Sequence, residues 1–253
     1  MNDDNFLEAV SRFGAARCPV ALTGAGISVA CGIPDFRSPG GLWEEFAPSE
    51  YATISVFRKD PAKAWQLYRA MGKILVDKQP SEAHLALGRL EEHGLLSGVV
   101  TQNVDNLHQL GGSSRVFEIH GDHQHLQCLR CGRLEAVSED HFSSGEVPEC
   151  EQCACPLKPN VVLFGEDVRH LAEIQALIEQ CDLLMVIGTS AQVYPAASLP
   201  QIVKDRGGVI YEFNQEQTPL SMVSASRVVL TDYFLDGDVE VTLPLFVRQL
   251  LET

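Results

Sequence analysis

Short apolar runs alternate with longer amphipathic stretches along most of this chain. The runs have the length of buried strands and lie at Val20–Leu22, Gly98–Val100, Val116–Ile119, Leu183–Ile187 and Val209–Phe213. The stretches between them show helical spacing, as in the N-terminal set of Phe6, Leu7, Val10 and Phe13. Such alternation predicts an α/β fold, a Rossmann-like parallel sheet with helices on both faces. Leu230-Thr231 and an amphipathic helix over residues 239–251 are expected to complete it.

Two stretches break this alternation. Residues 34–80 are rich in aromatic residues and helix formers, with prolines as breakers, and predict a helical insertion that forms a cover. Residues 122–162 carry a four-cysteine motif. We expect the two insertions to pack together as one smaller domain that faces the sheet. The Rossmann-like domain would then comprise residues 1–33, 81–121 and 163–253.

Length and charge narrow the functional classes. The chain has 253 residues, 45% of them hydrophobic, which suits one or two domains with a sizeable core. A formal net charge of −15 argues against unaided binding to nucleic acid or an anionic membrane, and it is compatible with a cationic peptide partner. No apolar run approaches the roughly 20 residues of a membrane helix, and the acidic N-terminus lacks the features of a secretory signal. We therefore expect a cytoplasmic protein.

Cysteine spacing gives the strongest chemical signal in the insertions. Cys128 and Cys131 form one Cys-x-x-Cys pair, and Cys150 and Cys153 form a second pair after eighteen intervening residues. Two such pairs supply the four thiolates of a tetrahedral zinc site, which leaves no open coordination position, so the metal should hold structure and take no part in chemistry. Cys155 could replace Cys153 as the fourth ligand, although the two-residue gap favours Cys153.

Glycine-rich or polar turns follow three of the expected strands. They are TGAGIS at 23–28, GTSAQ at 188–192 and NQEQT at 214–218. Each lies where a parallel sheet cradles a nucleotide, and Gly24 and Gly26 would let backbone N–H groups approach a pyrophosphate at a helix N-terminus. The first turn departs from the dinucleotide fingerprint because Val29 replaces the third glycine and no acidic residue is well placed about 20 positions later. Taken alone, it is nearly as typical of a tight turn without a ligand.

A rigid loop with an aromatic ring and a cation follows at residues 32–38, Gly-Ile-Pro-Asp-Phe-Arg-Ser. Phe36 could shield a reactive centre from water, and Arg37 could meet a phosphate or a carboxylate. The alternative is an ordinary proline-containing turn whose phenylalanine packs inward.

The stretch that begins at Thr101 carries the most informative polar residues. It follows an expected strand at its carboxyl end, where open α/β sheets bind their ligands. Asn103 and Asp105 are two positions apart, so on an extended backbone their side chains face the same side. Together they could bind a carboxamide group. The alternative is that one of them caps a short helix that ends at Gly111-Gly112, and both interpretations can hold at once.

Among the eight histidines, His120 is the best candidate for a general base. It ends the apolar run 116–119 directly before Gly121, and an imidazole pKa near 6.5 suits proton transfer at neutral pH. The other seven are expected at the surface or in helix caps: His84, His93, His108, His123, His125, His141 and His170.

Together these motifs resemble the sirtuin family, the NAD-dependent protein deacylases. The resemblance is colinear over nearly the whole chain. It comprises GAGIS at 24–28, GIPDFRS at 32–38, TQNVDNLH at 101–108, HG at 120–121, the two Cys-x-x-Cys pairs, KPNVVLFGE at 158–166, GTSAQVYPA from 188 and EFN at 212–214. It also accounts for the incomplete glycine fingerprint, because sirtuins bind NAD with a glycine loop of their own.

The resemblance implies that NAD is the co-substrate and that several loops bind it. The residues expected around its pyrophosphate, ribose and adenosine groups are Gly24, Ala25, Gly26, Ser28, Arg37, Gly188, Thr189, Ser190 and Asn214. Those expected around its nicotinamide are Phe36, Gln102, Asn103 and Asp105. The implied metal is a structural zinc ion.

The implied second substrate is an acyl-lysine in a protein or peptide. The residues expected to pair with it as an added strand are Val162, Leu163, Phe164, Gly165 and Glu166. Such pairing gives main-chain affinity with little sequence selectivity. In the implied reaction the acyl oxygen captures C1′ of the ribose as nicotinamide leaves, with Asn103 and Asp105 acting at the nicotinamide end. His120 then takes a proton from the ribose hydroxyls, and the products are lysine and 2′-O-acyl-ADP-ribose.

The acyl pocket is where this sequence departs from some relatives. Sirtuins that prefer succinyl- or malonyl-lysine carry Tyr-x-x-Arg in the helical insertion, and here the aligned residues are Tyr68 and Met71. Arg69 lies on another face of the expected helix and does not replace that arginine. We therefore expect acetyl or longer neutral acyl groups to be favoured. The family's long terminal extensions are not seen in this sequence, and we expect a minimal core enzyme of prokaryotic type. We also expect a monomer or a weak oligomer.

Two other functions stay open from the sequence. The same pocket could support mono-ADP-ribosyl transfer or NAD hydrolysis, although neither reaction needs His120 for the later step. A zinc-ribbon module that binds nucleic acid or a partner is disfavoured by the acidic charge and by the lack of a basic, aromatic-interleaved face.

Overall fold

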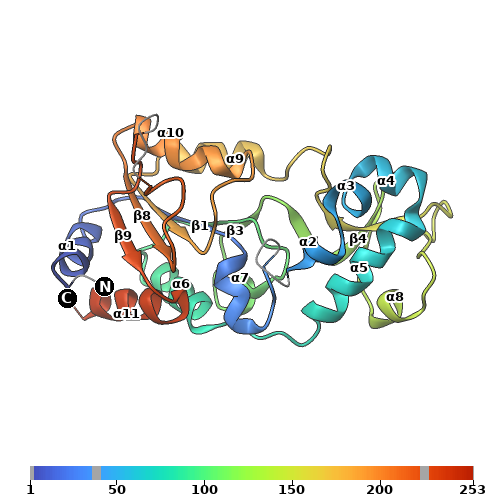
Figure 1. Ribbon diagram of the computed structural model, residues 1–253, viewed down its shortest axis with the longest axis horizontal. Helices are drawn as coiled ribbons and strands as arrows, with labels where there is room; N and C mark the ends of the chain where they lie inside the picture. The colour runs from blue at the N-terminus through green and yellow to red at the C-terminus, as the bar shows by residue number, and fades with distance from the viewer. Residues whose placement is uncertain (1–2, 36–40, 223–227, 253) are drawn as a thin grey trace.

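The computed structural model describes residues 3–35, 41–222 and 228–252, and Figure 1 shows a larger and a smaller lobe side by side. The larger lobe contains a six-stranded sheet and both ends of the chain. Its strands are β1 (Pro19–Thr23), β2 (Val99–Thr101), β3 (Val116–Glu118), β7 (Leu183–Ile187), β8 (Val209–Asn214) and β9 (Tyr233–Asp236). The first five agree with the apolar runs to within one residue at each end. The sixth begins at Tyr233, later than the Leu230-Thr231 pair.

The strand order explains where a ligand site forms. The order is β3-β2-β1-β7-β8-β9 and every pairing is parallel, which is the 3-2-1-4-5-6 arrangement of a Rossmann sheet. The chain therefore builds outward from β1 in one direction and then from β7 in the other. In such sheets the ligand crevice lies beyond the carboxyl ends of the two central strands.

Helices cover both faces of this sheet, as expected. One face is covered by α1 (Asp3–Phe13), α6 (Glu82–Glu92) and α11 (Val239–Leu251), and the other by α9 (Leu171–Ile178) and α10 (Leu199–Asp205). The short elements near the carboxyl edge are the 3₁₀ helices η1 (Ala25–Cys31) and η2 (Ala196–Ser198) and the helix α7 (Leu107–Leu110).

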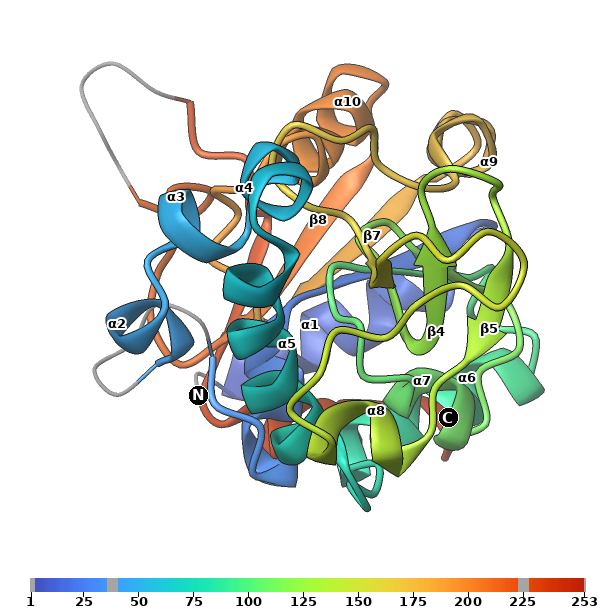
Figure 2. The same cartoon turned by 90° about the vertical axis from the view of Figure 1, so that its right-hand side faces the viewer.

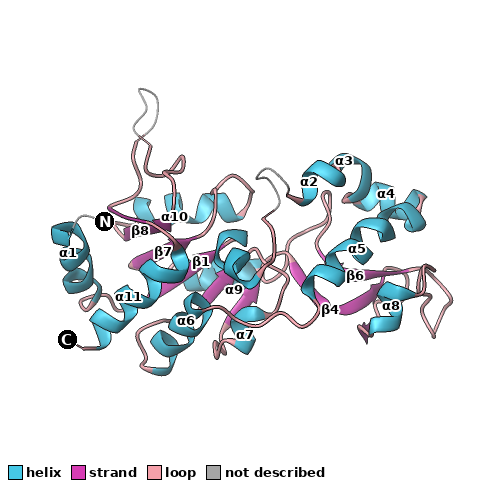
Figure 3. Cartoon of the chain, turned by 60° about the horizontal axis from the view of Figure 1, so that its bottom comes forward, coloured by secondary structure: helices cyan, strands magenta, loops and turns pink. Residues whose placement is uncertain are grey.

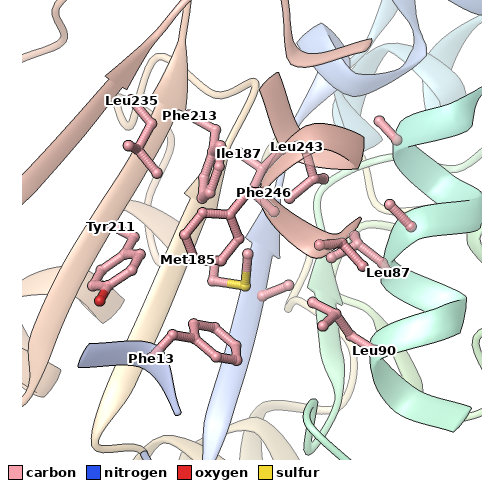
Figure 4. Packing of buried hydrophobic residues seen from close by; sticks show 14 of the residues in the cluster. Phe13, Leu87, Leu90, Met185, Ile187, Tyr211, Phe213, Leu235, Leu243 and Phe246 are labelled. Carbon is pink, nitrogen blue, oxygen red and sulfur yellow. The ribbon is translucent and has the colours of Figure 1, made fainter. Parts of the chain in front are cut away.

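Both faces of the sheet carry apolar cores, which is why the strand sequences are continuous apolar runs. On the α1, α6 and α11 side, Phe246 packs edge-to-face on Phe13 and Phe213, with ring centroids 5.6 and 5.4 Å away. Figure 4 shows this cluster between the strands of the sheet and the helices that cover this face. Met185 of β7 belongs to it, whereas the neighbouring Leu184 faces the core under α9 and α10.

The smaller lobe combines the two insertions (Figure 2). Its helices are α2 (Leu42–Glu45), α3 (Pro48–Tyr51), α4 (Ile54–Lys59), α5 (Pro61–Leu75) and α8 (Glu139–Ser143). Its three-stranded sheet, in the order β5-β4-β6, consists of β4 (Gly121–Cys128), β5 (Leu134–Ala136) and β6 (Leu157–Val161).

One hydrophobic core holds the smaller lobe together. Trp65 of α5 is fully buried, packs against Phe142 of α8, and donates its Nε1–H to the Leu157 carbonyl of β6 at 2.8 Å. Residues of both insertions form this core. We therefore propose that residues 34–80 and 122–162 form one domain and that the rest of the chain forms the other. The connections between the lobes at residues 76–81, 119–120 and 162–170 are loops (Figure 3). Nowhere in the described ranges is a helix both long and apolar enough to cross a membrane.

Candidate active site

Two glycine loops meet at the carboxyl ends of β1 and β7. The Gly26 N–H donates to the Gly188 carbonyl at 2.8 Å. A Cβ atom on Gly26 would lie 2.7 Å from the Gly188 Cα, and one on Gly24 would lie 2.7 Å from the Thr189 Cβ. These glycines therefore allow the two loops to touch, and the Gly26 amide already has a partner. The helix that follows β1 is the seven-residue 3₁₀ helix η1.

Asn103 and Asp105 converge on one hydroxyl group. The Asn103 side-chain amide donates to the Ser28 Oγ at 3.1 Å and to the Gly24 carbonyl at 3.2 Å, and the Ser28 hydroxyl donates to Asp105 at 2.7 Å. The other oxygen of Asp105 accepts the N–H of Leu107, the first residue of α7, at 3.0 Å. The N-cap residue of α7 is Asn106, so neither Asn103 nor Asp105 is the cap itself. The two side chains therefore face one place.

A buried histidine fixes the direction of these hydrogen bonds. His84 Nδ1 accepts the Ser81 N–H at 3.3 Å in the cap of α6, so the ring proton lies on Nε2, which is 3.5 Å from the Ser28 Oγ. Burial lowers the pKa of His84, although the charge of Asp105 opposes this, and the ring is neutral. With Nε2–H directed at it, the Ser28 hydroxyl donates its own proton to Asp105.

The expectation that all seven remaining histidines are surface or capping residues is wrong for two of them. His108 is fully buried on α7, with Nε2 2.8 Å from the Thr23 Oγ1, and burial lowers its pKa well below the usual value. His123 stacks on Phe142 at 5.1 Å, and burial lowers its pKa to about 4. Both rings face the interior because α7 and β4 pack against neighbouring elements that local sequence does not specify.

The other five histidines fit the expectation. His84, although buried, and His141 belong to helix capping boxes, His93 ends α6, and His125 and His170 are exposed.

His120 lies at the end of β3 with one ring nitrogen held by the backbone. Its Nδ1 is 3.0 Å from the Gln102 carbonyl oxygen, and a carbonyl only accepts, so Nδ1 carries the proton. Nε2 is then the free basic nitrogen. Burial lowers the pKa of His120, opposed by the hydrogen bond to Gln102, so the ring is neutral at pH 7. The His120 carbonyl accepts the Val162 N–H at 2.7 Å and ties the residue to the expected peptide segment.

A cavity of about 30 Å³ opens between η1 and the smaller lobe. Its lining residues are Ala25, Ser28, Ile33, Pro34, Leu42, Met71, Ile74, Leu75, Asn103, Val104 and Asp105. The structure thus brings Met71 into the same cavity as Asn103 and Asp105. Tyr68 is not among these residues and packs against Trp65 in the core of the smaller lobe, with ring centroids 5.7 Å apart. Phe36 and Arg37 lie outside the described residues.

The third group of expected residues lies beside β7 and β8. The Gln102 side-chain amide donates to the Thr189 Oγ1 at 2.9 Å, and the Asn214 side-chain amide reaches the Thr189 carbonyl at 3.4 Å. Ser190 follows on the same loop and is partly exposed. Asn214 also donates to the buried Glu212 at 3.2 Å. This network links the carboxyl ends of β2, β7 and β8.

Four cysteine sulfurs gather at the far end of the smaller lobe. The Sγ atoms of Cys128, Cys131, Cys150 and Cys153 all lie within 4.8 Å of one another. The Sγ atoms of Cys128 and Cys153 are 3.5 Å apart and those of Cys131 and Cys150 are 3.6 Å apart, near the roughly 3.8 Å separation of thiolates in a tetrahedral zinc site. The Cys155 Sγ is not part of this group and lies 3.6 Å from the Arg130 guanidinium. The donor set and spacing fit zinc.

Comparisons with known proteins agree with this arrangement. The Sir2 family model matches residues 24–195, more than half of the chain. The chain belongs to the Sir2 family. A Thermococcus sibiricus member described as an NAD-dependent protein deacylase is 41% identical over 249 residues, covering 95% of each chain. The resemblance to sirtuins is therefore confirmed.

Two solved Sir2 structures share the fold. A Sir2 homolog–NAD complex superposes with a TM-score of 0.88 at 38% identity, over 97% of this chain and 94% of that one. A Sir2–p53 peptide–NAD⁺ complex gives a TM-score of 0.82 at 34% identity, over 97% and 96%.

Within this Sir2-family chain, sequence reasoning missed one residue that orients the site. His84 was grouped with surface and capping histidines, yet it contacts Ser28 directly. A signal was available, because a serine three residues before a histidine at the start of an apolar helix resembles a capping box. The capping-box pattern does not predict that Nε2 of His84 faces Ser28 of η1.

Proposed function

We propose that this chain is an NAD-dependent protein deacylase that transfers the acyl group of an acyl-lysine to the ADP-ribose of NAD. The main observation behind this proposal is the content of the ligand crevice of the Rossmann sheet. It holds His120, with a free Nε2, and the cluster of Asn103, Ser28 and Asp105. The family relationship supports the proposal, since the relatives are described as NAD-dependent deacylases and deacetylases.

The cavity residues suit a nicotinamide. Asp105 accepts hydrogen bonds, and Asn103 keeps its side-chain carbonyl free because only its NH₂ is used in the cluster. The carboxamide NH₂ of nicotinamide needs an acceptor, which Asp105 can provide, and the free Asn103 carbonyl can accept a hydrogen bond from a hydroxyl group or a water. Apolar side chains such as Ile33 and Leu42 would exclude water around the ring. NAD, when bound, supplies the electrophilic ribose carbon, and zinc, when bound by the four thiolates, supplies only structure.

His120 is the base in this proposal. Its Nδ1 keeps its proton and donates it in the hydrogen bond to the Gln102 carbonyl, so Nε2 accepts a proton without a change of tautomer. The lowered pKa keeps Nε2 unprotonated at neutral pH. A positioned general base contributes roughly 10²–10⁴-fold to a rate.

We propose that the acyl group is neutral. Met71 stands in the cavity wall, and the cations that a succinyl or malonyl carboxylate would need are not among the lining residues, within the portion of the chain that is described. Arg69 points elsewhere, since its guanidinium donates to the Glu146 carbonyl and lies over the Trp65 ring. Acetyl and longer aliphatic groups would avoid the cost of burying an unpaired carboxylate.

A panel of acyl-lysine peptides with NAD tests the function. Mass spectrometry should detect lysine peptide, nicotinamide and 2′-O-acyl-ADP-ribose with acetyl peptide, and much slower turnover with succinyl peptide. His120→Ala should abolish product, and His125→Ala, a change at an exposed histidine, should not. NAD consumption that is equal with and without peptide would instead identify an NAD hydrolase.

A further inference from the structure

One lysine in the smaller lobe is completely buried. The Lys158 side chain, on β6, has 0% exposure, and its ammonium is satisfied by three acceptors. They are the Val161 carbonyl at 2.7 Å, the Pro159 carbonyl at 3.3 Å and the Glu166 carboxylate at 3.1 Å. Burying a charge is costly unless it is paired and hydrogen-bonded, so such a residue needs an explanation.

Both ends of this ion pair act on the segment expected to bind peptide. The Glu166 oxygen that faces Lys158 also accepts the Leu163 N–H at 2.9 Å, and the Glu166 N–H donates to the Leu163 carbonyl at 2.9 Å. Lys158 meanwhile holds the Val161 carbonyl directly before the segment. The pair therefore closes a turn over residues 161–166.

The remaining contacts hold the segment from its two sides. Phe164 donates its N–H to the Ala52 carbonyl at 2.9 Å and accepts the Ile54 N–H at 3.1 Å, in a parallel bridge to the helical insertion. Val162 donates its N–H to the carbonyl of His120 at 2.7 Å. Most main-chain groups of the segment are thus used within the protein.

Gly165 leaves both of its main-chain groups available. In the described parts of the structure, its N–H and C=O have no hydrogen-bond partner, and the residue is exposed with φ of +93°. Glycine adopts this conformation without strain. The turn therefore presents a free main-chain donor and acceptor on the segment that Val162 ties to the candidate base, His120. A free donor and acceptor are the requirement for pairing with an extended peptide.

We propose that the buried Lys158–Glu166 ion pair positions the Gly165 turn for main-chain pairing with the acyl-lysine peptide, so that Lys158 is a positioning residue for substrate binding. This inference rests on the proposed deacylase function. It assigns a role to a residue that contacts neither NAD nor the reacting atoms.

The test uses the full chain with an acetyl-lysine peptide and NAD. We compare the wild type with Lys158→Met, Lys158→Arg and Glu166→Gln. The control is Lys63→Met, which removes a partly exposed lysine paired with Glu50 at 2.9 Å. Each variant yields kcat, a peptide KM at saturating NAD, a NAD KM at saturating peptide, and a melting temperature.

We expect Lys158→Met to raise the peptide KM by about tenfold or more, a typical effect of losing a buried charge-assisted hydrogen bond, with kcat and the NAD KM within about twofold. Lys158→Arg should recover most of the peptide affinity, and Lys63→Met should change nothing. If Lys158→Met does not fold, Glu166→Gln must show the same selective rise in peptide KM. An unchanged peptide KM in a folded variant, or equal losses in all three kinetic parameters, would overturn the inference.

A wild-type protein without NAD-dependent deacylation would contradict the proposed function separately. In that case fluorescence anisotropy with a labelled acetyl-lysine peptide decides the inference by itself. It stands if the wild type binds and Lys158→Met binds about tenfold more weakly. It fails if the two bind alike or if neither binds.

Discussion

At Ser28 a single hydroxyl connects three parts of the chain. It accepts from Asn103 of the loop after β2, faces His84 Nε2 of α6, and donates to Asp105. Ser28→Ala should leave the Asp105 carboxylate without its shortest side-chain hydrogen bond. We expect kcat to fall by about tenfold to a hundredfold, in keeping with the loss of a hydrogen bond to a charged group.

Ser113→Ala is the matched control for this change. Ser113 is equally buried, but its Oγ has no hydrogen-bond partner, so its removal should leave kcat and stability nearly unchanged. Steady-state kinetics of the two variants decides the point. Equal kcat values for Ser28→Ala and the wild type would mean that the cluster does not orient Asp105.

His120 gives a prediction about pH. Because the base must be unprotonated and burial lowers the pKa of His120 below its usual 6.5, kcat/KM should stay level through neutral pH. It should decline only on acidification below pH 6.5, with a slope that approaches one proton. A pH profile of kcat/KM with acetyl peptide measures this. An acidic limb that begins above pH 6.5 would exclude His120 as the titrating base.

The position of a residue could be predicted where it directly follows a strand. It could not be predicted where packing between distant parts of the chain determines it. Asn103, Asp105 and His120 follow apolar runs directly, so their position at the carboxyl edge could be read from sequence. His108 and His123 could not be placed, because their burial depends on Thr23 and Phe142, which are distant in the chain. Tyr68 and Met71 were grouped through the family resemblance, whereas only Met71 lines the cavity.

The cysteine pairs lie at the end of one pair of strands, β4 and β6. β4 ends at Cys128 and pairs with β6 across from Leu157, so the first knuckle lies at the end of this antiparallel ladder. We expect Cys153→Ser to reduce bound zinc well below one ion per chain and to lower the melting temperature. Cys155→Ser should retain the zinc, because the Cys155 sulfur lies outside the four-sulfur group.

Elemental analysis of the purified variants and their thermal unfolding make this measurement. Full zinc occupancy in Cys153→Ser combined with loss in Cys155→Ser would show that Cys155 is the fourth ligand. The same pair of variants also tests whether zinc is only structural, since acetyl-peptide turnover should follow the folded fraction.

Elements were predictable to different degrees for a physical reason. The parallel strands are buried on both faces, so each is a continuous apolar run that is visible in sequence. In the smaller sheet, β4 and β5 have exposed positions, so neither is a continuous apolar run. Because β4 pairs with β6 some thirty residues away, the local sequence does not specify the register of this pairing. The 3₁₀ form of η1 likewise depends on its contact with the Gly188 loop.

At the scale of the whole molecule, buried ionisable groups couple the fold to pH in opposite directions. Burial holds the pKa of His123 at about 4, below the usual 6.5, so this histidine stabilises the fold above pH 6.5 and that stability is lost on acidification. His84, His108 and His120 also have lowered pKa values and act in the same direction. Burial raises the pKa of Glu118 from 4.5 to about 7, so its contribution is present at low pH and lost as pH rises.

The sum should be a protein that is less stable at pH 5 than at pH 7, since four histidines with lowered pKa values outweigh one carboxyl group. His123 alone accounts for about 2 kcal/mol of that difference, from roughly 1.5 pH units of unequal protonation. Replacing His123 with Gln should therefore shrink the difference in unfolding free energy between the two pH values, and Glu118→Gln should enlarge it. His125→Gln, at an exposed ring, should leave this difference unchanged.

Denaturant unfolding of the wild type and the three variants at both pH values gives the comparison. If Glu118→Gln reduced the difference instead, the Glu118 carboxyl would be ionised in the native state, and its burial between β3 and α7 would have to be compensated by a cation.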